Sequence, residues 1–271
     1  MKPRCLIVCV NYDDILAITL PRNIDKFSEC CVITSPADIA TIDFVAMFPE
    51  VRLFVTDAFY RHGAKFNKGL AIEEAFDFFG RHGWMLVLDA DIVLPYAVEL
   101  AGVTAGNIYG ANRRMLLDPA AYADTLDWGT LKLEKEHEIA GFFQLFHADD
   151  THLQVRPWYE PTFMHAGGCD AYFQQLWPRH NRIRLPLQVL HIGPRDTNWF
   201  GRVSSRTDGA TYGHVAESSQ MMRKLKVANK WLKHRQAGLR DTDPVEQANA
   251  RLQIPGYDSK FKWFNSEPKD E

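Results

Sequence analysis

Short apolar runs alternate with amphipathic stretches through the first ninety residues. Runs of strand length cover Leu6–Val10, Cys30–Thr34, Val51–Val55 and Trp84–Asp89. Helical spacing or helix start and stop signals cover Asp13–Leu20, Ile39–Phe48 and Lys68–Phe79. Strands without polar alternation, separated by helices, are typical of a parallel sheet covered on both faces. The pattern therefore predicts a doubly wound α/β sheet.

The pattern changes after Pro95. Strands are predicted at Tyr109–Leu117, Ile139–His147 and Leu185–Ile192, with a loop or short helix at Pro119–Trp128 and a helix over Gly168–Leu176. Residues 193–215 are rich in Gly, Ser, Arg and Asn and predict a loop. A basic helix around Met221–Arg235 and a polar tail complete the chain.

Composition adds limits to this picture. The chain has 271 residues, 46% of them hydrophobic, which is enough for a sizeable core. Its first apolar stretch, Cys5–Val10, is too short for a signal peptide or a membrane span. Five cysteines without a Cys-x-x-Cys spacing indicate reduced thiols. We therefore expect a cytoplasmic protein with no transmembrane segment.

Charge is unevenly distributed along the chain. Residues 173–240 carry 13 Lys and Arg against 3 Asp and Glu, although the whole chain carries 31 Lys and Arg against 34 Asp and Glu. Such a segment fits a phosphate-bearing partner, either a nucleotide or a nucleic acid. A solvated basic helix explains the same count, and the sequence leaves both open.

Two carboxylates, Asp89 and Asp91, follow directly on the strand Trp84–Asp89. Side chains at i and i+2 of a strand point to the same side, about 6.6 Å apart at ~3.3 Å per residue. Such a pair suits a hard divalent cation, and ligands bind at the carboxyl ends of strands in open α/β sheets. A turn before Pro95 is the plain alternative. The sequence lacks the P-loop, the Gly-x-Gly-x-x-Gly and the Gly-x-Ser-x-Gly motifs, which disfavours the corresponding nucleotide-binding and hydrolase classes.

Four segments in order resemble the GT-A glycosyltransferases, especially inverting enzymes of the family 2, polypeptide N-acetylgalactosaminyltransferase and β-1,4-galactosyltransferase type. They are Asn67-Lys68-Gly69, Asp89-Ala90-Asp91, Gly167-Gly168-Cys169-Asp170 and His191. The resemblance implies a GT-A fold: a Rossmann-like, mostly parallel sheet flanked by helices, with a C-terminal acceptor and lid region. It implies a catalytic domain over 1–215, divided into a nucleotide-binding half (1–95) and an acceptor half with a lid loop (96–215). Residues 216–271 would pack on the same domain.

The resemblance also assigns a metal site and a base. Asp91 would ligate Mn²⁺ or Mg²⁺ with His191, and Asp89 would lie near the ribose and the metal. Asp170 would be the general base that takes the proton of the acceptor hydroxyl. Cys169 departs from the family's usual acidic residue, which weakens that assignment. The plain alternatives are a strand-end histidine bonded to backbone and an N-cap aspartate.

Further residues are implied to contact the two substrates. The nucleotide-binding set is Val10, Asn11, Tyr12, Thr34, Asp38, Lys65, Asn67, Lys68, Asp89 and Ala90, with Tyr12 as a base-stacking candidate and the lysines toward the phosphates. The sugar, acceptor and lid set is Gly141, Phe142, Gly167, Gly168, Arg195, Asn198, Trp199 and Arg202. Solvated lysines, a core strand at Gly141 and an ordinary surface loop at the lid are the plain alternatives.

The function implied by the resemblance is metal-dependent transfer of a hexose, with inversion, from a nucleotide sugar to an acceptor hydroxyl. The expected donor is a UDP-sugar. The acceptor would be a saccharide or glycolipid, and the basic segment adds hydroxymethylated DNA as an option. The alternative is a non-catalytic nucleotide-sugar or carbohydrate-binding module on the same fold.

Overall fold

A computed structural model describes residues 1–98, 100, 102–135, 139–194, 198–202, 204 and 206–208. Arg195, the basic helix predicted around Met221–Arg235 and the region 216–271 lie outside the described residues. Nothing in the described part tests the predicted domain boundaries.

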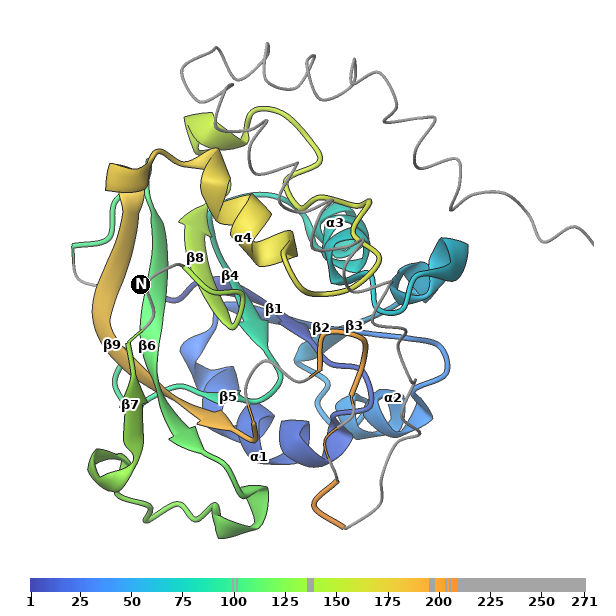
Figure 1. The fold of residues 1–271 in the computed structure, drawn as a ribbon, viewed down its shortest axis with the longest axis vertical. Coiled ribbons are helices and arrows are strands. Elements are labelled where there is room, and N and C mark those ends of the chain that lie inside the picture. Colours follow the sequence, from blue (N-terminus) through green and yellow to red (C-terminus); the bar gives the residue numbers. More distant parts are fainter. Residues whose placement is uncertain are drawn as a thin grey trace, which may run out of the picture.

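One curled sheet forms the centre of the molecule (Figure 1). Its strands are β1 (Arg4–Val8), β2 (Glu29–Thr34), β3 (Val51–Val55), β4 (Trp84–Asp89), β5 (Ile92–Val93), β6 (Ile108–Leu116), β7 (Lys132–Glu134), β8 (Phe143–His147) and β9 (Arg182–Ile192). Their order is β3-β2-β1-β4-β8-β6-β9-β5, with β7 paired to β6. Strands β1 to β4, β6 and β9 run in one direction, and β5, β7 and β8 run against them.

Helices cover both faces of this sheet (Figure 1). On one face lie α1 (Asp13–Asn23) and α2 (Ile39–Val45), and on the other lie α3 (Lys68–Phe79) and α4 (Cys169–Phe173). This arrangement confirms the predicted fold class, a mostly parallel α/β sheet flanked by helices.

Strand alternation divides the core into two layers. Leu6 and Val8 of β1 pack with α3 and α4, whereas Cys5 and Ile7 pack with α1 and α2. Because both faces are covered, β1 is buried along its whole length. The unbroken apolar runs in the sequence therefore have their origin in this two-sided burial.

Element boundaries differ from the sequence prediction at several points. Helix α1 continues through Pro21 to Asn23, and α4 ends at Phe173 and continues as a 3₁₀ turn over Gln174–Leu176. The strand predicted from Ile139 begins only at Phe143. Strands β5 and β7 were not predicted, because two or three residues carry no readable periodicity. All five cysteines are buried free thiols, and no helix in the described residues is long and apolar enough to cross a bilayer.

Helix α3 approaches a loop closely through a glycine. A Cβ added at Gly69 would lie 2.4 Å from the carbonyl oxygen of Glu160, a backbone atom that cannot rotate away. Gly69 therefore sets the distance between the start of α3 and the segment that leads to α4.

We expect Gly69→Ala to lower the free energy of unfolding by roughly 1–3 kcal/mol through overpacking, although Ala is the better helix former. Urea unfolding at equilibrium measures the change. The control is Gly129→Ala, whose Cβ would come no closer than 3.0 Å to the end of the Asp127 side chain instead of 2.4 Å to a backbone atom. A Gly69→Ala protein as stable as wild type would contradict the steric argument.

Candidate functional site

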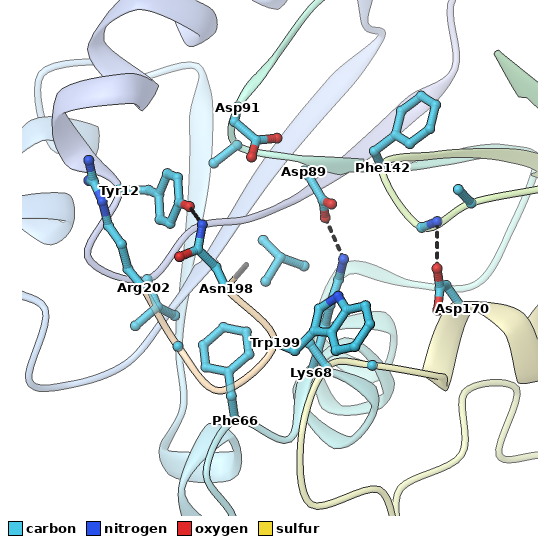
Figure 2. A pocket seen from close by; sticks show the side chains of 18 of the residues that line it. Tyr12, Phe66, Lys68, Asp89, Asp91, Phe142, Asp170, Asn198, Trp199 and Arg202 are labelled. Carbon is cyan, nitrogen blue, oxygen red and sulfur yellow. Dashed lines mark hydrogen bonds and ion pairs between the residues drawn. The ribbon is translucent and has the colours of Figure 1, made fainter. Parts of the chain in front are cut away.

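A pocket of about 240 Å³ opens at the carboxyl ends of the parallel strands (Figure 2). It collects side chains from several separate parts of the chain. They are Val8, Val10, Tyr12, Phe66, Lys68, Asp89, Ala90, Asp91, Arg113, Ala140, Gly141, Phe142, Ala166, Gly167, Gly168, Asp170, His191, Pro194, Asn198, Trp199, Gly201 and Arg202. Most residues that the sequence assigned to the site lie here.

Asp89 reaches the pocket because β4 pairs in register with β1. Val8 and Asp89 are the last partners of that pairing, so the carboxylate comes at the strand end. The ammonium of Lys68, from the first turn of α3, forms an ion pair with the Asp89 carboxylate (Figure 2). Lys68 is 8% exposed, so its charge is compensated inside the protein.

The electrostatics of this pair reflect its crowded surroundings. Burial opposes the charge of Lys68, but Asp89 beside it keeps the pKa of the ammonium above its ordinary value. Burial raises the pKa of Asp89, and the nearby carboxylates of Asp91 and Asp170 raise it further against the pull of Lys68. A cation entering the pocket would relieve this repulsion.

Asp91 and His191 meet through the antiparallel pairing of β5 with β9. Ile92 pairs with His191, and the Ile192 amide donates to the Asp91 carbonyl at 2.9 Å. His191 Nδ1 lies 3.2 Å from the Gly193 carbonyl oxygen, which orients the ring and leaves Nε2 3.6 Å from Asp91 Oδ2. Asp91 Oδ1 is buried without a hydrogen-bond partner. Such an orphaned carboxylate oxygen is a ready position for a cation or a donor group.

Asp170 lies on the opposite wall of the pocket. Its Oδ2 accepts a hydrogen bond of 2.8 Å from the Gly141 amide (Figure 2). A Cβ at Gly141 would lie 2.7 Å from the Asp170 Cβ, so only glycine permits this approach. The N-cap of α4 is Gly168, in the left-handed region at φ 107°, so the alternative of Asp170 as an N-cap is wrong.

The described residues of the segment 198–208, which are 198–202, 204 and 206–208, border the pocket through Asn198, Trp199, Gly201 and Arg202 and bond to α1. Arg202 forms a two-bond ion pair with Asp14, one bond being 2.9 Å, and donates to the Asn11 carbonyl at 2.8 Å. Burial alone would raise the pKa of Asp14, but the bonds from Arg202 and from the Thr207 amide keep it below the ordinary value. The guanidinium of Arg202 therefore already has a partner, rather than standing ready for a diphosphate.

Tyr12 is held between this segment and the pocket. The guanidinium carbon of Arg202 lies 4.4 Å from the centre of the Tyr12 ring, and the Asn198 amide donates to the Tyr12 hydroxyl. Trp199 contributes its carbonyl to the Ala166 amide at 2.9 Å, while its side chain remains 40% exposed. One face of the predicted base-stacking ring is thus covered by Arg202 (Figure 2).

Several residues assigned to nucleotide binding do not line the pocket. Asp38 caps α2 at the Thr41 amide, and it also accepts bonds from Thr34 Oγ1 and from the Asn11 amide, at 2.9 and 2.6 Å. Asn67 caps α3 at the Leu70 amide and donates to the Pro161 carbonyl. Lys65 is absent from the lining as well. Thr34, Asp38 and Asn67 therefore make hydrogen bonds within the fold, and the Asn11 amide, at a backbone φ of 59°, donates to Asp38; their contact with a nucleotide stays a prediction.

The sequence prediction missed some lining residues. Arg113 of β6 borders the pocket with its guanidinium carbon 4.6 Å from the centre of the Phe142 ring, and Phe66 and Ala166 border it as well. Arg113 reaches the pocket because β6 pairs in parallel with β9. These two strands lie far apart in the sequence, so no local motif predicts their register.

Within the described residues, no group of three or more His, Cys, Asp or Glu side chains is gathered as a metal cluster. Asp91 and His191 nevertheless offer a carboxylate and an imidazole side by side, with Asp91 Oδ1 unpartnered. Two protein ligands suit an ion that takes its remaining ligands from substrate phosphates and water.

No protein-family model and no curated protein matches this chain. Solved structures similar to it include an inositol-1-phosphate CTP transferase from T. maritima, at 7% identity and a TM-score of 0.44, over 73% of this chain and 92% of that chain. Galactosyltransferase LgtC with donor and acceptor sugar analogues is similar at 10% identity and a TM-score of 0.42, over 83% and 95%. A 4-diphosphocytidyl-2C-methyl-D-erythritol synthase is similar at 16% identity and a TM-score of 0.37, over 86% of this chain and 100% of that chain. Likeness at this level assigns neither a family nor a function.

We expect Arg202→Met to release the segment from α1, because it leaves the buried carboxylate of Asp14 without its partner. Cleavage by chymotrypsin after Trp199 and Phe200 should become at least about tenfold faster, since local opening exposes these sites. The matched control is Arg61→Met, which removes a two-carboxylate pairing at a more exposed position. Equal cleavage rates in wild type and Arg202→Met would show that the ion pair does not hold the segment.

Proposed function

We propose that this protein is a metal-dependent glycosyltransferase that transfers a hexose from a nucleotide sugar, most simply a UDP-sugar, to an acceptor hydroxyl with inversion. The observation that supports it best is that Asp91 and His191 line the same pocket as Asp170, at the strand ends. A cation-binding pair and a separate carboxylate in one pocket match the two needs of such a reaction: charge stabilisation at the leaving diphosphate and removal of a proton from the acceptor.

Asp170 is the proposed base. Its Oδ2 is held by the Gly141 amide, so the carboxylate has a fixed direction toward the pocket. In an inverting transfer, the acceptor oxygen attacks the anomeric carbon while the bond to the diphosphate breaks, and the hydroxyl proton passes to the carboxylate of Asp170. Asp89 is less suited to this role because Lys68 is bonded to it.

Asp91 and His191 are the residues that would hold Mn²⁺ or Mg²⁺. The unpartnered Asp91 Oδ1 and the inward Nε2 of His191 fit such an ion. When bound, the ion would stabilise the charge that develops on the departing diphosphate. The ion pair between Lys68 and Asp89 would hold the neighbouring wall of the pocket at a fixed distance from Asp91 and His191.

The acceptor is proposed to be a saccharide or glycolipid. The option of hydroxymethylated DNA as acceptor rested on the basic segment 173–240. Residues 209–240 of that segment lie outside the described residues. Binding to DNA through phosphates would weaken steeply as salt rises. Titration with hydroxymethylated duplex at two salt concentrations therefore separates the two acceptor classes.

We expect Asp91→Asn to abolish the Mn²⁺-dependent part of UDP binding, because the amide lacks the charge that a hard cation prefers. Calorimetric titration of UDP with and without Mn²⁺ measures this part, and a loss of at least about tenfold is expected. Asp118→Asn, outside the pocket, serves as the control, since Asn also caps its turn. Unchanged UDP affinity with Mn²⁺ in Asp91→Asn would remove the metal assignment.

The decisive experiment is slow hydrolysis of donors across a panel of nucleotide sugars with Mn²⁺. Wild type should release the nucleotide from at least one donor, and NMR of the released sugar, recorded before it mutarotates, should show an inverted anomeric centre. Asp170→Asn should bind that donor normally but turn over roughly 10²–10⁴-fold more slowly, because the amide cannot take the proton.

The side-chain amide oxygen that Asp170→Asn introduces can still accept the bond from the Gly141 amide, so this variant should fold. Asp118→Asn should turn over like wild type. Tight donor binding without hydrolysis of any donor would favour the non-catalytic module instead. Near-normal turnover in Asp170→Asn would remove Asp170 as the base.

A further inference from the structure

A second pocket lies beside the far end of α1, with a volume of about 430 Å³. Its walls come from the last turn of α1, from Val93–Tyr96 after β5 and from residues 122–128. It shares no lining residue with the candidate functional site. Nothing in the proposed transfer reaction uses it.

Three aromatic side chains line this second pocket. Tyr96 is completely exposed, whereas Tyr122 and Trp128 pack at their base on the buried cluster that contains Val93. Trp128 opens a 3₁₀ turn that Asp127 caps by accepting a 2.8 Å bond from the Gly129 amide. The rings of Tyr122 and Trp128 are therefore anchored, and the exposed ring of Tyr96 lines the same pocket.

The charged groups around the aromatic rings are paired with one another. Arg22 forms an ion pair with Asp124, and Lys26 forms one with Asp25 at 2.9 Å. The Tyr122 hydroxyl lies near both members of the Arg22–Asp124 pair. The four charged lining groups thus sum to zero and still offer donors and acceptors at the rim.

We propose that this pocket binds a neutral saccharide. Sugar rings carry apolar C–H faces that pack on aromatic rings, and hydroxyls that exchange hydrogen bonds with paired guanidinium and carboxylate groups. Because the four charges are already paired, an anionic ligand finds no surplus positive charge here. A purely apolar ligand would desolvate two ion pairs without replacing their bonds to water.

The pocket lies one helix length from the candidate site. Asp14, in the first turn of α1, lies beside the candidate site, and Arg22, in its last turn, lines the second pocket. The eleven residues of α1 span ~16 Å at 1.5 Å per residue. A saccharide held here leaves the candidate site open. The inference goes beyond the proposed transfer reaction and does not require it, because binding is tested without turnover.

The test uses the full chain and three neutral probes: maltotriose, cellotriose and N-acetyllactosamine. Saturation-transfer NMR and calorimetric titration should detect binding of at least one of them. Trp128→Ala and Tyr96→Ala should each weaken it at least about tenfold, the upper range for loss of one stacked ring. Tyr96 is fully exposed, so its replacement leaves folding intact even if Trp128→Ala does not fold.

Two controls locate the binding. Phe78→Ala removes another exposed aromatic ring, and Trp199→Ala removes an exposed ring from the candidate site; both should bind the probe like wild type. The proposal is overturned if none of the three probes binds, or if binding survives both aromatic replacements. It is also overturned if Trp199→Ala abolishes binding, because the probe would then occupy the candidate site. Failure of donor hydrolysis would leave these results unchanged.

Discussion

The ion pair between Lys68 and Asp89 is the interaction on which the candidate site depends. Asp89, Asp91 and Asp170 converge on one pocket, where like charges repel more strongly than in water. Lys68 supplies the compensating charge from within the protein. Removing one member of a buried pair costs about 3–5 kcal/mol, because the other charge remains buried. The pair therefore fixes the start of α3 against the end of β4.

The position of Lys68 is itself set by its two neighbours in the chain. Asn67 caps α3 and bonds to the Pro161 carbonyl, and Gly69 allows the Glu160 backbone to lie against the first turn. The tripeptide thus joins a helix cap, a buried charge and a close backbone contact. The same Glu160–Pro161 segment leads on to Gly168 and α4, which carries Asp170. The two walls of the pocket are therefore connected through this short stretch of backbone.

Local pattern accounts for the first half of the fold because each of its first three apolar strands is followed by a helix before the next strand begins. The sequence also revealed Asp89 and Asp91, because charged residues directly after an apolar strand can be recognised without knowing the rest of the fold. Arg113 was not found, because it enters through the pairing of β6 with β9, whose register depends on distant residues. Asp38 was assigned to nucleotide binding because residues after a strand often face a ligand. Its oxygens accept hydrogen bonds from Thr34, from the Asn11 amide and from the first turn of α2, which the local pattern did not reveal.

Charge counted along the sequence and charge arranged in space lead to different conclusions about the basic segment. The excess of arginine and lysine over 173–240 suggested a partner rich in phosphate. Within the described residues, Arg202 pairs with Asp14 and Arg206 pairs with Asp13, both at the start of α1. Acidic residues early in the chain thus neutralise basic residues that come nearly two hundred positions later. These two arginines attach the described residues of the segment 198–208 to the start of α1, and their charges are already paired with carboxylates.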